Sequence, residues 1–235
     1  MPYSRVLVIS FIFIFPSFVV CQVPRKSFNP DNLTENYLGD LKKEYGNKKQ
    51  YPPQFEKQIL IALSHYPELE HTSILFRIRR RHTPATTKVT LTGLFEAPEI
   101  RHYVITISDS TEDMLMPLLF KNLPFNVQVG VIGHELGHVA DPSTQSLFQL
   151  LKHAVRNISR KYIDRFEYNT DAICIAHGLG YQLLEWSRYV RTTMNTINWD
   201  GPDYAHRKKD RERYMNPSTI EKRINENLLY KSIEQ

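Results

Sequence analysis

Two histidines and a glutamate stand at a spacing that suits metal chemistry. His134, Glu135 and His138 form the run HELGH inside the largely apolar stretch VGVIGHELGHVAD. On a helix, residues four apart project from one face, so both imidazoles can reach a single tetrahedral Zn²⁺. Glu135 is placed to take a proton from water at that ion. Burying these three side chains in an apolar helix without a shared partner would be costly, which favours a metal site over a chance pattern.

A catalytic zinc needs a third protein ligand and an open fourth position. We favour Glu167, in RFEYNTDAICIA, because the chain after His138 is long enough to form a helix and return to the metal. Asp171 shares a helix face with Glu167 and could accept a hydrogen bond from the non-ligating nitrogen of a histidine. Asp141 is the alternative ligand, although its place before Pro142 better suits the N-cap of a following helix.

A hydrolytic site would also need a hydrogen-bond donor for its transition state. The donors downstream of the motif are His177, Tyr181, Tyr204, His206 and Tyr214. We favour His177 and Tyr181, because the glycines of HGLGY permit a sharp chain reversal near the end of the ligand helix. Cys174, between apolar neighbours, is expected to be a buried hydrophobe rather than a nucleophile.

The hydrophobic periodicity changes along the chain from strand-like to helical. It predicts strands over 73–81, 89–95 and 102–108. It predicts helices over 55–66, 112–121, 124–140, 143–162, 164–177, 181–194 and 217–230. Strands first and helices later indicate an α+β domain, in which a small, mainly antiparallel or mixed sheet precedes a helical half.

The first residues are expected to lie outside that domain. Residues 6–20 are almost wholly apolar and follow one positive charge, a pattern that suits a signal peptide and is short for a membrane span of about 20 residues. Cleavage after Cys21 would export the chain to a periplasm or the extracellular space. A lipid anchor on Cys21 is the weaker alternative, because Val20 is larger than the usual preceding residue.

The remaining chain divides into a polar arm over residues 22–52 and a catalytic domain over 53–235. By its polarity and position, the arm could cover the cleft as a pro-segment. No transmembrane helix is expected after residue 21. The net charge of +5 is too modest for a nucleic-acid footprint, and the basic runs at 77–82 and 206–213 are expected to be solvated.

Two of these motifs resemble those of a known family. HELGH (134–138) followed by EYNTD (167–171) is similar to the HExxH…ExxxD pattern of gluzincin zinc metallopeptidases, nearest the HtpX and CaaX-prenyl-protease-like branch. NPSTIEKRI (216–224) is similar to a C-terminal His-Pro…Arg-Ile element of that branch, with Asn216 in the place of the histidine.

The resemblance implies a zincin-like fold and the hydrolysis of a peptide or protein substrate. It implies His134, His138 and Glu167 as Zn²⁺ ligands, Glu135 as general base and Asp171 as the residue that orients His134. It also implies an edge strand that lines the cleft, for which we choose 102–108.

Two non-catalytic hypotheses compete with a peptidase. The chain could be a zinc-binding module with a structural or occluded site, or an envelope-associated binding protein that keeps an inherited fold. Glu135 favours the enzyme, because a purely structural zinc site has no use for that carboxylate.

Overall fold

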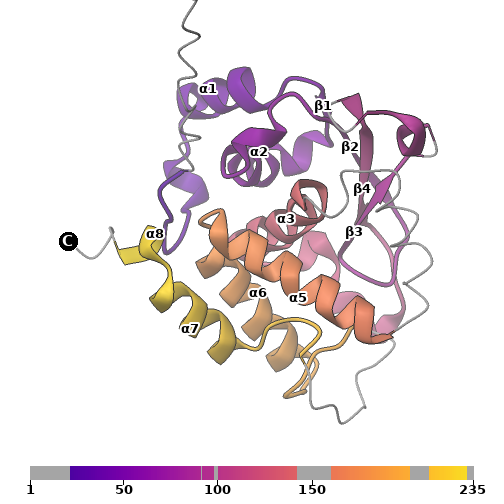
Figure 1. Ribbon diagram of the computed structural model, residues 1–235, viewed down its shortest axis with the longest axis vertical. Coiled ribbons are helices and arrows are strands. Elements are labelled where there is room, and N and C mark those ends of the chain that lie inside the picture. Colours follow the sequence, from indigo (N-terminus) through magenta and orange to yellow (C-terminus); the bar gives the residue numbers. More distant parts are fainter. Residues whose placement is uncertain (1–21, 91, 98–99, 142–159, 202–211, 232–235) are drawn as a thin grey trace, which may run out of the picture.

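The computed structural model describes residues 22–231, except for residues 91, 98–99, 142–159 and 202–211. The expected signal peptide with Cys21, most of the expected helix 143–162, and Tyr204 and His206 lie outside the described residues. The described chain is an α+β fold in which a small mixed sheet lies beside a larger group of helices (Figure 1), as the sequence predicts. None of the described helices is long and apolar enough to cross a membrane.

The sheet has four strands, which are β1 (Lys49–Gln50), β2 (Ser73–Arg79), β3 (Ala85–Val89) and β4 (His102–Ser108). Their order is β1-β2-β4-β3; β2 runs parallel to β1 and β4, and β3 runs antiparallel to β4. The 102–108 segment is thus a strand, but it lies inside the sheet. The expectation that it forms the edge was wrong, because β3 pairs along its outer side.

The expectation of a strand over 89–95 was also wrong. Val89 is the last residue of β3, and Gly93–Phe95 is a 3₁₀ turn. Arg101, whose side chain is buried, donates hydrogen bonds to the carbonyl oxygens of Gly93 and Glu96 and so holds the chain in a turn at this point.

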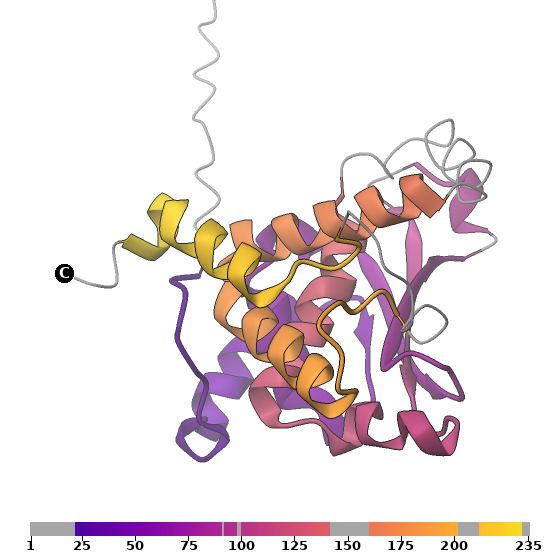
Figure 2. The same ribbon diagram turned by 90° about the horizontal axis from the view of Figure 1, so that it is seen from below.

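Helix α3 (Phe125–Ala140) runs through the middle of the molecule (Figures 1 and 2) and is buried along most of its length. It packs against the sheet at β3 and against helices on its other sides. These helices are α2 (Glu56–Ser64), α5 (Arg160–Ala176) and α6 (Gly180–Thr193). The chain ends in α7 (Pro217–Glu226) and α8 (Leu228–Lys231), where one longer helix was expected.

Two glycines let α3 approach its neighbours closely. A methyl group on Gly130 would overlap the backbone carbonyl of Gln182 in α6, and one on Gly137 would lie 3.0 Å from Cγ2 of Thr170 in α5. Because neither glycine has a side chain, the backbone of α3 comes close to α6 at Gly130 and to α5 at Gly137. The close approach to α5 lets Thr170 reach His138.

Residues 22–52 pack on this core. They contain α1 (Glu35–Tyr45), which begins at the capping hydroxyl of Thr34 and packs on α2. Phe28, Leu41 and Tyr45 of this segment are buried in the main hydrophobic core.

The stretch 112–121, expected to be a helix, forms 3₁₀ turns at Asp113–Leu118 and Phe120–Asn122 instead. Pro117 lacks the N–H that an α-helix would need at this place. Asp141 has an extended backbone and ends α3, and the helix that it was expected to begin lies outside the described residues.

Candidate metal centre

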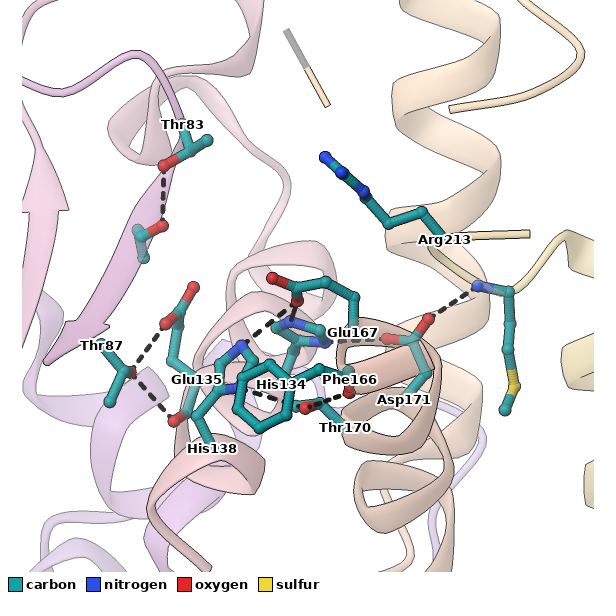
Figure 3. Close-up of polar contacts among 12 residues, drawn as sticks. Thr83, Thr87, His134, Glu135, His138, Phe166, Glu167, Thr170, Asp171 and Arg213 are labelled. Atoms are coloured by element: carbon teal, nitrogen blue, oxygen red, sulfur yellow. Dashed lines mark hydrogen bonds and ion pairs between the residues drawn. The ribbon is translucent and has the colours of Figure 1, made fainter. Parts of the chain in front are cut away.

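Three predicted ligands meet where α3 crosses α5 (Figure 3). His134 and His138 come from α3 and Glu167 from α5, and one ligand atom of each lies within 4.8 Å of the others. Oε2 of Glu167 is 3.2 Å from Nε2 of His134 and 3.3 Å from Nε2 of His138. These three side chains can hold a metal ion.

The other ring nitrogen of His134 is bound to a carboxylate. Its Nδ1 lies 2.8 Å from Oδ1 of Asp171, one helical turn after Glu167. The second oxygen of Asp171 accepts a hydrogen bond from the backbone N–H of Met215 at 2.7 Å. A carboxylate with this partner accepts the Nδ1–H of the imidazole, so Nε2 is the nitrogen that faces Glu167.

His138 is oriented in the same sense by a hydroxyl. Its Nδ1 lies 3.1 Å from Oγ1 of Thr170, and that hydroxyl donates its proton to the Phe166 carbonyl at 3.0 Å. The threonine oxygen therefore accepts the Nδ1–H of His138, which again leaves Nε2 toward Glu167. The Phe166 ring stacks on the imidazole with centroids 5.0 Å apart.

The two separations from the Glu167 oxygen are compatible with a tetrahedral metal site. Atoms about 2.0–2.1 Å from a tetrahedral ion lie about 3.3–3.4 Å from one another. The distances of 3.2 and 3.3 Å from Oε2 of Glu167 to the two Nε2 atoms are close to that edge length. A carboxylate oxygen this close to two Nε2 atoms also requires a cation, either a proton or a metal ion, to lie between them.

The electrostatic environment favours positive charge on the cluster. Burial opposes protonation of His134, but hydrogen bonds and charges from Asp171 and Glu167 outweigh it and raise its pKa well above the ordinary value. Burial would likewise raise the pKa of Glu167, yet the charges and hydrogen bonds of His138 and His134 hold it well below its usual range. The same negative charges of Asp171 and Glu167 would stabilise a divalent cation at this position.

The Glu135 carboxylate lies between the ligand cluster and the edge strand of the sheet (Figure 3). Its side chain is buried, and its Oε2 lies 2.7 Å from the hydroxyl of Thr87 in β3. That hydroxyl is also 3.0 Å from the Glu135 backbone carbonyl. The threonine thus holds one oxygen of the Glu135 carboxylate and leaves the other without a bond to Thr87.

A segment before α7 covers the other side of the site and carries Tyr214. Arg213 donates to Asp164 at 2.8 Å and to the Asp200 carbonyl at 2.9 Å, while the Met215 N–H is held by Asp171. Between these anchors, the Tyr214 ring lies 5.8 Å from the His134 ring, centroid to centroid.

The environment of Tyr214 keeps its phenol protonated. Burial and the negative charges of Glu167, Glu135 and Asp171 raise its pKa well above the ordinary value, against the opposing charge of Arg213. A protonated phenol is a hydrogen-bond donor, and the Tyr214 ring lies next to His134.

The two donors that we favoured from the sequence do not reach the cluster. His177 follows α5, about ten residues and therefore about 15 Å along the axis from Glu167. Its Nε2 is bound to Glu68 at 2.7 Å, and its ring stacks on Tyr66. Tyr181 lies on α6 and packs edge-on against Tyr230. Gly178, at φ +82°, turns the chain away at the end of α5, so HGLGY leads away from the cluster.

Other predicted residues have structural surroundings. Cys174 is fully buried, and burial raises the pKa of its thiol, as expected of a core residue. Asp141 is not among the residues that form the metal-ligand group. The amide of Asn216 is bound to Arg191 and Glu212.

Sequence reasoning missed Thr87, Thr170 and the Met215 N–H. Thr170 lies four residues after Phe166 and three after Glu167, so a hydroxyl on the ligand face of the helix was a usable signal. Thr87 could not be found this way, because its contact with Glu135 depends on how β3 pairs in the sheet.

Compared with protein-family models, curated proteins and solved structures, the chain matches none of them. Its function must therefore be argued from the chemistry of the site.

Proposed function

We propose that this protein is a zinc-dependent hydrolase of peptide bonds, built on a zincin-like fold. The observation that carries the proposal is the convergence of two Nε2 atoms and one carboxylate oxygen at distances of 3.2 and 3.3 Å. Each histidine donates its other nitrogen to a partner on α5, as ligands of a protein-bound metal commonly do. A zinc ion held by these three side chains would keep a position for water or substrate, as catalytic rather than structural zinc sites do.

When bound, zinc supplies a Lewis acid that polarises the scissile carbonyl and lowers the pKa of water. Glu135 accepts the proton from the attacking water at the oxygen that Thr87 does not hold, and it delivers this proton to the leaving amine. Tyr214 donates its phenolic hydrogen to the negative charge that develops on the substrate oxygen. Asp171 and Thr170 keep both imidazoles oriented throughout.

The placement of Glu135 distinguishes this proposal from a non-catalytic metal site. A structural ion would have no use for a fourth buried side chain beside its ligands. Here the carboxylate is buried next to the cluster and is oriented by a residue from another element. Burying a carboxylate costs free energy unless it is paired and hydrogen-bonded, and a role in proton transfer would explain why Glu135 is kept at this place.

The proposal is tested by zinc content and hydrolysis of a quenched peptide library by the chain that lacks residues 1–21. We expect one zinc per chain in wild type, far less in Glu167→Ala, and full zinc with turnover at least about 100-fold lower in Glu135→Gln. Glu44→Gln, a substitution on α1, is the control and should match wild type. Wild-type protein that binds no zinc, or Glu135→Gln protein with normal turnover, would refute the proposal.

A further inference from the structure

The face of the sheet turned away from the core carries a row of basic side chains. Along β2, Ile74 and Phe76 point into the core, so Arg77 and Arg79 point outward. Lys88 of β3 is exposed on the same outer face. The turn between β2 and β3 adds Arg80 and Arg81.

No ion pair within the described residues involves these five cations. None of these charges is therefore neutralised by a direct ion pair. A block of like charge on a rigid sheet attracts an anionic partner more strongly than scattered surface charges do.

The strand register extends this basic surface to the edge of the sheet. Arg77, Thr106 and Thr86 are register neighbours across β2, β4 and β3. Arg77 Nε donates to Thr106 Oγ1 at 3.2 Å, which lays the guanidinium over β4 and toward β3. On β3, next to Thr106, the Thr86 Oγ1 atom is buried and has no hydrogen-bond partner among the described residues.

The outer edge of β3 is unpaired within the described chain. Ser108 N donates to Pro84 O and Thr90 N donates to His102 O, so the even-numbered residues of β3 bond to β4. The backbone groups of Ala85, Thr87 and Val89 therefore face the free edge. Thr87 is also the residue that holds Glu135, so an extended chain on this edge would pass the catalytic carboxylate.

We infer that the substrate is an acidic peptide segment, whose alternate carboxylates lie on the outer face of the sheet beside Thr86, Lys88 and Arg77. This inference rests on the proposed function and names the substrate class of the same site. An extended chain paired with β3 places every second side chain on that face. A carboxylate there would meet the exposed cations of the basic row, while the intervening side chains lie on the side of Thr87 and Glu135.

Binding to the zinc-loaded Glu135→Gln protein tests the inference without hydrolysis. The probes are three fluorescein-labelled ten-residue peptides with Glu, Gln or Lys at every second position and alanine elsewhere. We expect the Glu peptide to bind at least about 10-fold more tightly than the Gln peptide, the Lys peptide to bind most weakly, and the preference to shrink with added salt.

The triple substitution Arg77→Gln, Arg79→Gln, Lys88→Gln should make the Glu and Gln peptides bind equally. The matched control, Lys43→Gln, Lys222→Gln, Lys231→Gln, removes the same charge from α1, α7 and α8, away from β3 (Figure 1), and should keep the preference. Zinc content and unfolding temperature show that each variant is folded.

Equal binding of the Glu and Gln peptides by the parent protein would overturn the inference. So would a preference that survives the triple substitution, or binding of anionic lipid vesicles in place of the peptides. Hydrolysis of library peptides without acidic preference would retain the proposed function and reject the substrate class. The opposite outcome would be binding of the Glu peptide that depends on the basic side chains, with no hydrolysis by wild type. It would retain the preference for acidic peptides and reject the proposed function.

Discussion

The two histidines of the cluster are oriented by unlike partners, a carboxylate at His134 and a hydroxyl at His138. The carboxylate strengthens the basicity of its imidazole, whereas the hydroxyl mainly fixes ring orientation. Thr170 is thus a positioning residue. Because its hydroxyl is neutral, replacing it tests the effect of ring orientation on metal affinity without changing the charge of the site.

Replacing Thr170 with valine should weaken zinc binding about 10- to 100-fold, because it removes the acceptor for the His138 Nδ1–H. Competition with a chromophoric chelator measures the change. Thr170→Ser should restore most of the affinity, and Thr196→Val, at an exposed hydroxyl bound to Asn198, is the control. Equal affinity of the Val and Ser variants would show that the hydroxyl has no part in metal binding.

Replacing Tyr214 with phenylalanine should lower kcat about 100-fold, with KM and zinc content little changed, because a donor to the transition state is lost. Steady-state kinetics on one library-derived peptide gives both constants. Tyr181→Phe serves as the matched control and should keep wild-type rates. A Tyr214→Phe enzyme with normal kcat would exclude the phenol from the reaction.

Prediction from sequence succeeded at this scale where the helical period alone brings residues together. His134 with His138, and Glu167 with Asp171, are each four apart, so a helix fixes their common face. The position of Tyr214 beside His134 could not be predicted, because it depends on anchors at Asp164 and Asp171 that are distant in the chain.

Among the secondary-structure elements, α3 determines the site through its packing as well as its ligands. Its glycines let α5 and α6 approach the backbone, and the meeting of His138 with Thr170 depends on that approach. The glycines can be read from the sequence, but the residues that pack against them, Gln182 and Thr170, could not be predicted from it.

Replacing Gly130 with alanine should destabilise the fold by about 1–3 kcal/mol, because the new methyl group would overlap the Gln182 carbonyl. Gly39, on the exposed side of α1, has nothing within 4 Å of an added methyl group. Gly39→Ala should stabilise by about 0.5–1 kcal/mol through helix propensity. Urea unfolding compares the two, and a Gly130→Ala protein as stable as wild type would contradict the close packing of α3 and α6.

The sheet was harder to predict than the helices for a physical reason. Which strand lies at the edge is set by pairing between distant segments, and the alternation along 102–108 is the same for an inner strand as for an edge strand. In 85–89 the inward position at Thr87 is polar because it serves Glu135, which weakened the strand pattern there.

For the whole molecule, stability should depend on pH through His65. Burial lowers the pKa of this histidine to about 4, opposed by its hydrogen bond to the His177 carbonyl and assisted by the charges of His177 and Arg25. Because the folded pKa is lower than the ordinary 6.5, the stabilisation is complete above pH 6.5 and is lost as pH falls toward 4.

This loss amounts to about 3 kcal/mol, at 1.4 kcal/mol for each pKa unit. Urea unfolding from pH 7.5 to 4 should therefore show a steeper fall in stability for wild type than for His65→Gln. His71→Gln, which removes an exposed histidine, should keep the wild-type slope. Parallel curves for wild type and His65→Gln would rule out this origin of acid sensitivity.

The ligands come from two helices, with His138 on α3 and Glu167 on α5, and this has a mechanical consequence for the molecule. An ion held between them closes a chain loop of about 30 residues, for which a covalent cross-link would contribute about 3–4 kcal/mol. Cys174 forms no disulfide, so it does not fasten these helices together. The ion would then act as a reversible cross-link between α3 and α5. A chelator would therefore lower the stability of the fold and abolish the activity together.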